Sequence, residues 1–197
     1  TAVIERDGAI VDENGIDIKA TYCAGFVRGL QLLDGMLQNP NYRAGMLVCS
    51  DVGGRFATAS TNRSAFCFIV GDAAGAVVLK PSYALGAPGI VDYTGTMLPS
   101  LSDLTSWGPD GRSLLVRGAR AGAATQSLLI RDARRLLDRN GLKVEDVDWL
   151  LPMQTHRGAV DALLEVLGWP EEKLLWFGDE TGYSASASIP AALAWKR

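Results

Sequence analysis

One cysteine, Cys23, stands where a thiol can act as a nucleophile. It follows a short extended run, residues 17–21, and precedes a segment with the spacing of a buried helix. The first N–H groups of a helix are free and its dipole favours negative charge, so a thiolate is stabilised there. Ala24 and Gly25 leave room beside the sulfur for a substrate carbonyl. Two interpretations stay open on this spacing: a catalytic nucleophile and a buried structural thiol.

The remaining residues with comparable chemistry are few. Cys49 and Cys67 lie in apolar runs typical of buried strands, where a thiol serves as a small hydrophobic side chain. Three cysteines without regular spacing argue against a disulfide framework, and a single histidine, His156, argues against a zinc site. His156 precedes a predicted helix, so it is either an exposed or capping residue or a displaced base. We expect neither a metal nor another cofactor.

Hydrophobic spacing predicts the elements that position Cys23. Apolar residues at a period near 3.6 predict a helix from Phe26 to Leu37, in which Gly29 indicates a close backbone approach. Strands are predicted at 46–50, 65–70, 76–79, 90–93, 147–151 and 174–177, with a turn of small residues at 71–75. Further helices are predicted at 123–139, ended by Asn140-Gly141, at 157–167, ended by Gly168, and from Ser188 onward. This alternation predicts an α/β protein with largely parallel sheets.

Composition excludes several classes of function. The chain has 197 residues, 48% of them hydrophobic, which suffices for one sizeable core or two small halves. Its net charge of −3 argues against nucleic-acid binding, which needs a basic face. No apolar run approaches the roughly 18 residues of a membrane span, and residues 1–6 lack the order of a signal peptide. We expect a cytoplasmic protein, away from membranes and nucleic acid.

Four segments carry a resemblance to a known family. They read IKATYCAGF at residues 18–26, VGDAAGAVVL at 70–79, VDWLLP at 147–152 and SASASIP at 184–190. In this order they resemble segments of the type III β-ketoacyl-acyl carrier protein synthases, of the thiolase superfamily. The resemblance implies a layered αβαβα fold with two mixed five-stranded-type sheets, partly represented. It implies that residues 1–85 are the latter part of the N-terminal half and carry the nucleophile, and that 86–197 are an incomplete C-terminal half.

The resemblance also exposes departures from the family pattern. The family pairs its cysteine with a histidine in a Pro-His-Gln segment and an asparagine in a Gly-Asn-Thr-Ser segment, which stabilise the enolate formed on decarboxylation. Here those positions hold Met153 and Tyr183. A Met thioether cannot donate a hydrogen bond, whereas Tyr183 keeps an O–H donor. Catalytic candidates are therefore Cys23, Tyr183 and His156, and candidate substrate contacts are Met153, Gly182 and Ala24. The chain also looks truncated at both ends relative to the family.

Three hypotheses compete. In the first, the chain is an acyltransferase of fatty acid or polyketide biosynthesis: Cys23 takes an acyl group from acyl-CoA or an acyl carrier protein and passes it to an acceptor. In the second, it is a catalytically degenerate partner subunit of an active ketosynthase. In the third, it is a conventional decarboxylative synthase whose histidine and asparagine lie elsewhere in the sequence. The resemblance implies a homodimer, or a heterodimer with another thiolase-fold chain.

Overall fold

The helix that follows the nucleophile forms as the sequence predicts. The computed structural model describes residues 15–18, 22–55, 68–84, 86–107 and 114–195. A short 3-10 turn, η1 (Tyr22–Ala24), leads into α1 (Gly25–Leu37), whose Phe26, Gly29 and Leu37 are buried. A Cβ on Gly29 would lie 2.5 Å from Cδ1 of Leu47, so the glycine lets α1 pack directly on the neighbouring strand. The expected close approach is confirmed.

Two long strands form an antiparallel ribbon beneath α1. β1 (Gly45–Val52) confirms the strand predicted at 46–50, and it pairs with β2 (Asp72–Leu79) from Gly45↔Leu79 to Val52↔Asp72. The predicted turn at 71–75 is wrong from Asp72 onward, because those residues already belong to β2. Their small size serves packing instead: a Cβ on Gly75 would lie 2.9 Å from Cβ of Pro190.

The predicted strand at 65–70 falls largely outside the described residues. In the part that is described, Val70 makes one isolated parallel bridge with Tyr183. This bridge brings the chain just before β2 beside the C-terminal part of the molecule.

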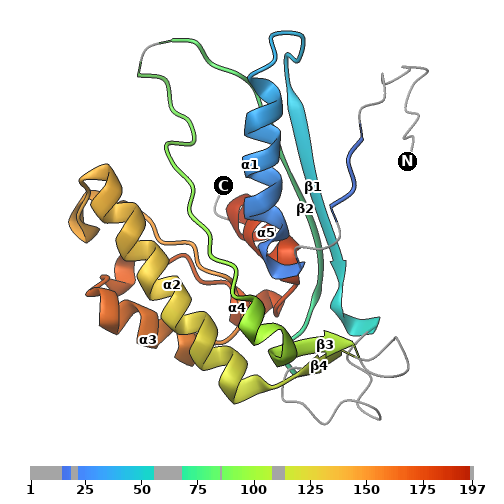
Figure 1. Cartoon of the computed structure of the whole chain (residues 1–197), viewed down its shortest axis with the longest axis vertical. Helices are drawn as coiled ribbons and strands as arrows, with labels where there is room; N and C mark the ends of the chain where they lie inside the picture. The colour runs from blue at the N-terminus through green and yellow to red at the C-terminus, as the bar shows by residue number, and fades with distance from the viewer. Residues whose placement is uncertain (1–14, 19–21, 56–67, 85, 108–113, 196–197) are drawn as a thin grey trace.

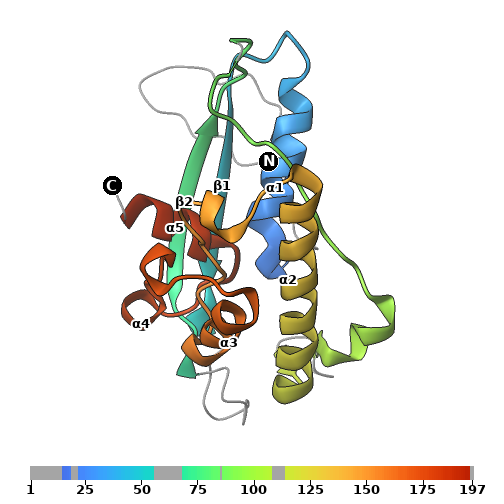
Figure 2. The same cartoon turned by 90° about the vertical axis from the view of Figure 1, so that its left-hand side faces the viewer.

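One face of the ribbon carries the first core. α1 lies along the ribbon, and α5 (Ser188–Trp195) packs on β2 beside it (Figures 1 and 2). Phe26, Cys49 and Ala187 form the buried centre, with Leu47 and Val77 packed against it. The opposite face leaves apolar side chains exposed, namely Met46, Val48, Val52 and Val78. The predicted last helix is confirmed, and it belongs to the core of the N-terminal elements; the predicted division after residue 85 stays a prediction.

The second core lies between two helices of the C-terminal part. α2 (Gly118–Asn140) starts earlier than predicted, and α3 (Arg157–Leu167) spans the predicted residues. Both end as expected at a glycine with positive φ, Gly141 at 64° and Gly168 at 66°. Val160, Leu164 and Trp169 are buried between them, against partly buried side chains from α2 and the loops. Short 3-10 turns, η5 (Val144–Asp146) and η6 (Glu171–Lys173), frame this core.

The expected parallel sheet is nearly absent from the described residues. The strands predicted at 147–151 and 174–177 reduce to one parallel bridge, Leu150↔Leu174. Pro152 has no N–H to continue the ladder, and η6 ends immediately before Leu174. Elsewhere the paired strands are antiparallel, including β3 (Thr105–Trp107) with β4 (Leu114–Val116). Two further 3-10 turns are η2 (Gly53–Arg55) and η4 (Pro99–Leu104).

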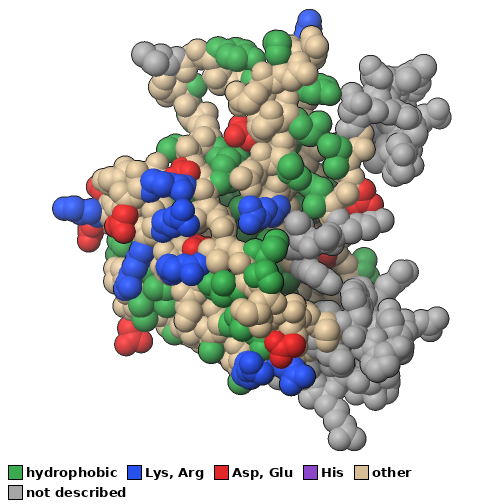
Figure 3. Space-filling model, in the orientation of Figure 1, with side chains coloured by type: hydrophobic (Ala, Val, Ile, Leu, Met, Phe, Trp, Pro, Cys, Tyr) green, Lys and Arg blue, Asp and Glu red, His purple; other side chains and the backbone are tan. Residues whose placement is uncertain are grey.

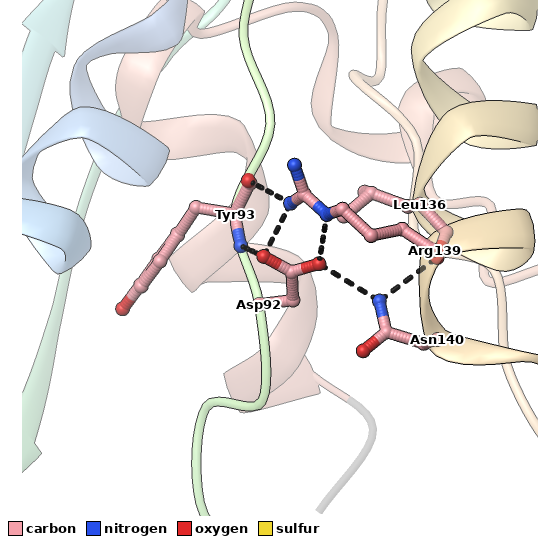
Figure 4. Close-up of polar contacts among 5 residues, drawn as sticks. All are labelled: Asp92, Tyr93, Leu136, Arg139 and Asn140. Atoms are coloured by element: carbon pink, nitrogen blue, oxygen red, sulfur yellow. Dashed lines mark hydrogen bonds and ion pairs between the residues drawn. The ribbon is translucent and has the colours of Figure 1, made fainter.

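An irregular connection ties α2 to α1, where a strand was predicted at 90–93. The carboxylate of Asp92 accepts hydrogen bonds from the guanidinium of Arg139, with Nε 2.7 Å from Oδ2, and from Nδ2 of Asn140 at 2.8 Å (Figure 4). Tyr93 donates its hydroxyl to the carbonyl of Leu30 in α1 at 3.4 Å. No strand forms here because the partners of this segment are side chains and helix carbonyls, not a neighbouring strand.

The surface over α2 carries several basic side chains, with acidic ones such as Asp138 among them. Lys and Arg side chains gather there in Figure 3, and Arg131, Arg134, Arg135 and Arg139 line a shallow depression on this helix. Within the described ranges, no helix combines the length and apolar character that a membrane span requires.

Candidate active site around Cys23

The structure places Cys23 in η1, directly before α1, where the sequence predicts the nucleophile. The side chain is partly buried. Burial raises the pKa of the Cys23 thiol above its usual value, and hydrogen bonds from the Tyr183 side chain and the local backbone oppose this only in part. Burial therefore acts against the stabilisation of the thiolate that the sequence predicts at the start of the helix, which stays a prediction.

Tyr183 reaches the sulfur from the opposite end of the sequence. Its side chain is 2% exposed and makes a hydrogen bond with Cys23. Its hydroxyl also lies 3.4 Å from Sδ of Met153, to which it can donate. Burial, reinforced by the adjacent Cys23, raises the pKa of Tyr183 far above its usual range. The phenol therefore stays protonated and serves as a donor. The structure thus brings together Cys23, Tyr183 and Met153, three of the predicted site residues.

The backbone of Tyr183 is held by the segment that precedes β2. Its N–H donates to the carbonyl of Ile69 at 2.6 Å, and its carbonyl accepts from the N–H of Gly71 at 2.8 Å. Gly182 adopts a positive φ of 66° after the short helix α4 (Gly178–Thr181). A Cβ on Gly182 would lie 3.2 Å from the nitrogen of Gly71, so the glycine permits this approach. Substrate contact by Gly182, and by the exposed Ala24, stays a prediction.

Gln154, which sequence reasoning missed, fixes the segment that carries Met153. Its side chain is 1% exposed. Nε2 donates to the carbonyls of Pro152 at 2.8 Å and Leu175 at 3.1 Å, and Oε1 accepts from the N–H of Phe177 at 2.7 Å. A polar side chain with all these partners costs little to bury. It positions the thioether of Met153 indirectly, through the backbone.

Asp51, also missed, joins β1 to the turn that follows Tyr183. Oδ2 accepts from Oγ of Ser186 at 2.6 Å and from the N–H of Ala187 at 3.0 Å. Both donors lie in the short turn η7 (Ala185–Ala187), immediately before α5. Asp51 is partly buried, and its negative charge contributes to the raised pKa of Cys23. The only sequence signal for it is a carboxylate directly after a predicted buried strand.

Two further residues considered in the sequence analysis, Cys49 and His156, have structural roles. Cys49 is buried in the first core, as expected for a structural thiol, and burial raises its pKa. His156 is exposed and is the N-cap of α3, where Nδ1 accepts from the N–H of Ala159 at 3.3 Å. Across the part of the chain that the structure describes, no hydrogen bond or ion pair joins His156 to Cys23. The capping alternative is confirmed, and the displaced base gains no support. Cys67 lies outside the described residues.

The cluster combines three groups of different hydrogen-bonding capacity. It holds the thiol of Cys23, the phenol of Tyr183, which donates, and the thioether of Met153, which cannot donate. Among the described residues, no group of three His, Cys, Asp or Glu side chains is placed to hold a metal ion.

The fold defines a class of protein, the thiolase-like α/β proteins, as shown by likeness to solved structures. Residues 16–95 match the model for 3-oxoacyl-[acyl-carrier-protein (ACP)] synthase III, and residues 137–196 match the model for the C-terminal part of that synthase. Together these matches cover most of the chain. The chain therefore belongs to the 3-oxoacyl-[acyl-carrier-protein] synthase III family of the thiolase superfamily.

Individual relatives agree with this assignment. The beta-ketoacyl-[acyl-carrier-protein] synthase III of Methylococcus capsulatus is 29% identical over 185 residues, which make up 89% of this chain and 56% of the relative. The crystal structure of 3-oxoacyl-(acyl carrier protein) synthase III, FabH, from Pseudomonas aeruginosa PAO1 matches with a TM-score of 0.81 and 25% identity, over 89% of this chain and 55% of that one.

The priming beta-ketosynthase of the R1128 polyketide biosynthetic pathway matches with a TM-score of 0.77 and 26% identity, over 89% of this chain and 55% of that one. The chain spans about half the length of the curated relatives it matches.

Proposed function

We propose that the chain is an acyltransferase that holds an acyl group on Cys23 and passes it to an acceptor without decarboxylative condensation. The observation that carries this is the hydrogen bond between Tyr183 and Cys23, with Met153 as the other neighbour of the phenol. The donor would be acyl-CoA or an acyl carrier protein, and the names of the relatives include the second of these. No cofactor is needed for these steps.

The proposed reaction has two steps. The Cys23 thiolate attacks the carbonyl carbon of the donor thioester, a new C–S bond forms, and the donor's C–S bond breaks to release its thiolate, which takes up a proton. An acceptor nucleophile then attacks the Cys23 thioester, loses its proton and expels the Cys23 thiolate. Tyr183 supports both steps by donating its hydrogen bond to the sulfur when it is negative, since such charge-assisted bonds are the stronger ones.

Decarboxylative condensation asks for more than this cluster offers. An enolate oxygen needs preorganised donors, and removing one such donor typically costs about 3–4 kcal/mol, or a few hundred-fold in rate. The thioether of Met153 cannot donate a hydrogen bond. The hydroxyl of Tyr183 has one proton to donate, and the sulfur atoms of both Cys23 and Met153 are possible acceptors. His156 is exposed and caps α3, which gives no support to its serving as the histidine of a conventional synthase.

The second candidate is a catalytically degenerate partner subunit. The favouring observation is the bare apolar face of the β1–β2 ribbon, where Met46 is 62% exposed, Val48 57% and Val78 61%. Such a face would be covered in an assembly with a second thiolase-fold chain, of the same or another kind. A thiol whose pKa is raised by burial is also compatible with a protein that does not turn over.

Intact-protein mass spectrometry separates the two candidates. Incubation with acyl-CoAs of different chain length should give a mass increase of one acyl group, retained in Cys49→Ser and absent in Cys23→Ser. An absence of adduct with every donor, in a sample that forms a stable complex with a ketosynthase chain, would establish the partner role instead. An adduct that survives Cys23→Ser would refute the assignment of the nucleophile.

A malonyl-CoA decarboxylation assay tests the missing donors. The wild-type chain should release little carbon dioxide, whereas the double variant Met153→His, Tyr183→Asn should release more because it restores the residue types of the family at both positions. Equal release by the two proteins would show that these positions do not limit decarboxylation.

A further inference from the structure

A carboxylate on β1 holds the turn that carries the Tyr183 side chain. Asp51 accepts two hydrogen bonds through Oδ2, one from Ser186 and one from the backbone of Ala187, across 135 and 136 positions of sequence. Both donors lie three to four residues after Tyr183. Hydrogen bonds to a carboxylate are charge-assisted and about twice as strong as those between neutral groups.

The turn between Tyr183 and α5 needs such support because its backbone is unusual. Ala185 has a φ of 43°, in the left-handed region that side chains with a Cβ rarely occupy. Strained positions of this kind persist only where surrounding contacts over-determine them. Here the contacts are Asp51 on one side and, on the other, Oγ of Ser188, which accepts from the N–H of Ser184 at 3.0 Å.

The two ends of this turn have different anchors. The backbone of Tyr183 is fixed by Ile69 and Gly71, whereas the residues after it are fixed by Asp51. The two anchors therefore hold the backbone at Tyr183 and in the turn that follows it. Among the described residues, the titratable side chains that affect the pKa of Cys23 are the phenol of Tyr183 and the carboxylate of Asp51.

We propose that Asp51 is a positioning residue, which clamps the turn at 184–187 so that the hydroxyl of Tyr183 points at the sulfur of Cys23. The inference deepens the proposed function, on which its role in acyl transfer rests. It adds that the same carboxylate disfavours the thiolate by repulsion while it holds in place the donor that favours it. Removing the charge and removing the clamp therefore have opposite effects on the thiol.

The test is a double-mutant cycle on the reactivity of Cys23. The rate of Cys23 carbamidomethylation by iodoacetamide is followed against pH by peptide-resolved mass spectrometry, which keeps Cys49 and Cys67 apart. Tyr183→Phe is introduced into the wild type, into Asp51→Asn and into Asp51→Ala. Asparagine keeps an acceptor oxygen for the turn without the charge, and alanine keeps neither. Asp72→Asn is the matched control. Asp72 is the first residue of β2, and its carboxylate accepts a hydrogen bond from the N–H of Gly54.

If Asp51 holds the turn at 184–187, the effect of Tyr183→Phe on Cys23 alkylation depends on the residue at position 51. Tyr183→Phe should shift the pH midpoint of alkylation upward in the wild type and in Asp51→Asn, and should have little effect in Asp51→Ala, where the phenol is no longer aimed. Asp51→Asn alone should move the midpoint downward and raise the rate at pH 7.5 by roughly twofold to threefold, as expected for one weakly screened charge. Asp72→Asn should leave both unchanged.

Three results would overturn the proposal. One is an equal effect of Tyr183→Phe in the wild type and in Asp51→Ala. Another is an unchanged midpoint in Asp51→Asn, which decides the matter if Asp51→Ala does not fold. The third is the same shift in Asp72→Asn as in Asp51→Asn. None of these involves acyl transfer, so the acyl-enzyme assay remains an independent test of the proposed function.

Discussion

Replacing Tyr183 by phenylalanine removes one oxygen atom from the Cys23 cluster and leaves the ring in place. The lost interaction is a hydrogen bond that lowers the pKa of the Cys23 thiol. Since a hydrogen bond to a charged group contributes about 1.5–3 kcal/mol, the thiolate fraction at a pH below the pKa should fall by about ten- to a hundredfold. A more basic thiolate is also more nucleophilic, with a Brønsted slope of about 0.4–0.5, which restores part of the rate.

The net expectation is an alkylation rate about fourfold to twentyfold lower at pH 7, a higher pH midpoint, and a faster rate on the alkaline plateau. Stability should change by no more than about 1 kcal/mol, because the remaining partner of the hydroxyl, Met153, is a weak acceptor. Iodoacetamide kinetics from pH 6 to 10, together with urea unfolding, measure both quantities. Tyr93→Phe is the matched control, since it removes a hydroxyl that donates to Leu30 instead. An unchanged midpoint in Tyr183→Phe, or an equal shift in Tyr93→Phe, would refute the assignment of Tyr183 as the donor.

Three further predictions concern stability. Gly29→Ala puts a Cβ 2.5 Å from Leu47 and should cost about 1–3 kcal/mol in urea unfolding, whereas Gly35→Ala on the same helix meets nothing within 4 Å and should stabilise by about 0.5–1 kcal/mol; equal effects would contradict the packing. Hydrogen bonds from neighbouring side chains hold the pKa of Asp92 below its usual value, so the stability it contributes is present above about pH 4 and lost as the pH falls further; Asp92→Asn should flatten urea midpoints between pH 5 and 2, and an unchanged slope would count against the link. Burial raises the pKa of Cys23, so stability should fall as the pH rises above about 8.5, where the unfolded thiol ionises first; Cys23→Ser should reduce this loss in thermal melts at pH 8 and 10, and an identical loss would refute it.

The helices were predictable because their signals are local. The apolar spacing of α1, the span of α3 and the glycines Gly141 and Gly168 that end α2 and α3 depend on residues within a few positions of one another. The strands were harder to predict, because a strand forms only where a neighbour offers N–H and C=O groups in register. Residues 90–93 have a strand-like composition, yet in the folded chain the carboxylate of Asp92 accepts a hydrogen bond from Arg139 at the end of α2.

The residues of the candidate site also differ in whether the sequence alone predicts them. The order of four motifs along the chain was enough to predict Cys23, Tyr183 and Met153, and the structure brings these three together. Asp51 and Gln154 had no comparable sequence motif. Asp51 lies 135 positions from its partner Ser186, Gln154 lies 23 positions from its partner Phe177, and most of the partners of these two residues are backbone groups. Because nearly every residue has a backbone N–H and C=O, the sequence does not indicate which of them bonds to a given side chain.

The amino-acid sequence by itself was enough to propose Cys23 as the nucleophile and to show Met153 and Tyr183 at the two positions where the resemblance places histidine and asparagine. It also determined the helix that begins beside Cys23. Only the tertiary structure decided the surroundings of that thiol: burial raises the pKa of Cys23, the hydrogen bond from Tyr183 lowers it, and the charge of Asp51 raises it. The physical reason is that dehydration and charge act through space, whereas a sequence motif specifies only neighbours along the chain.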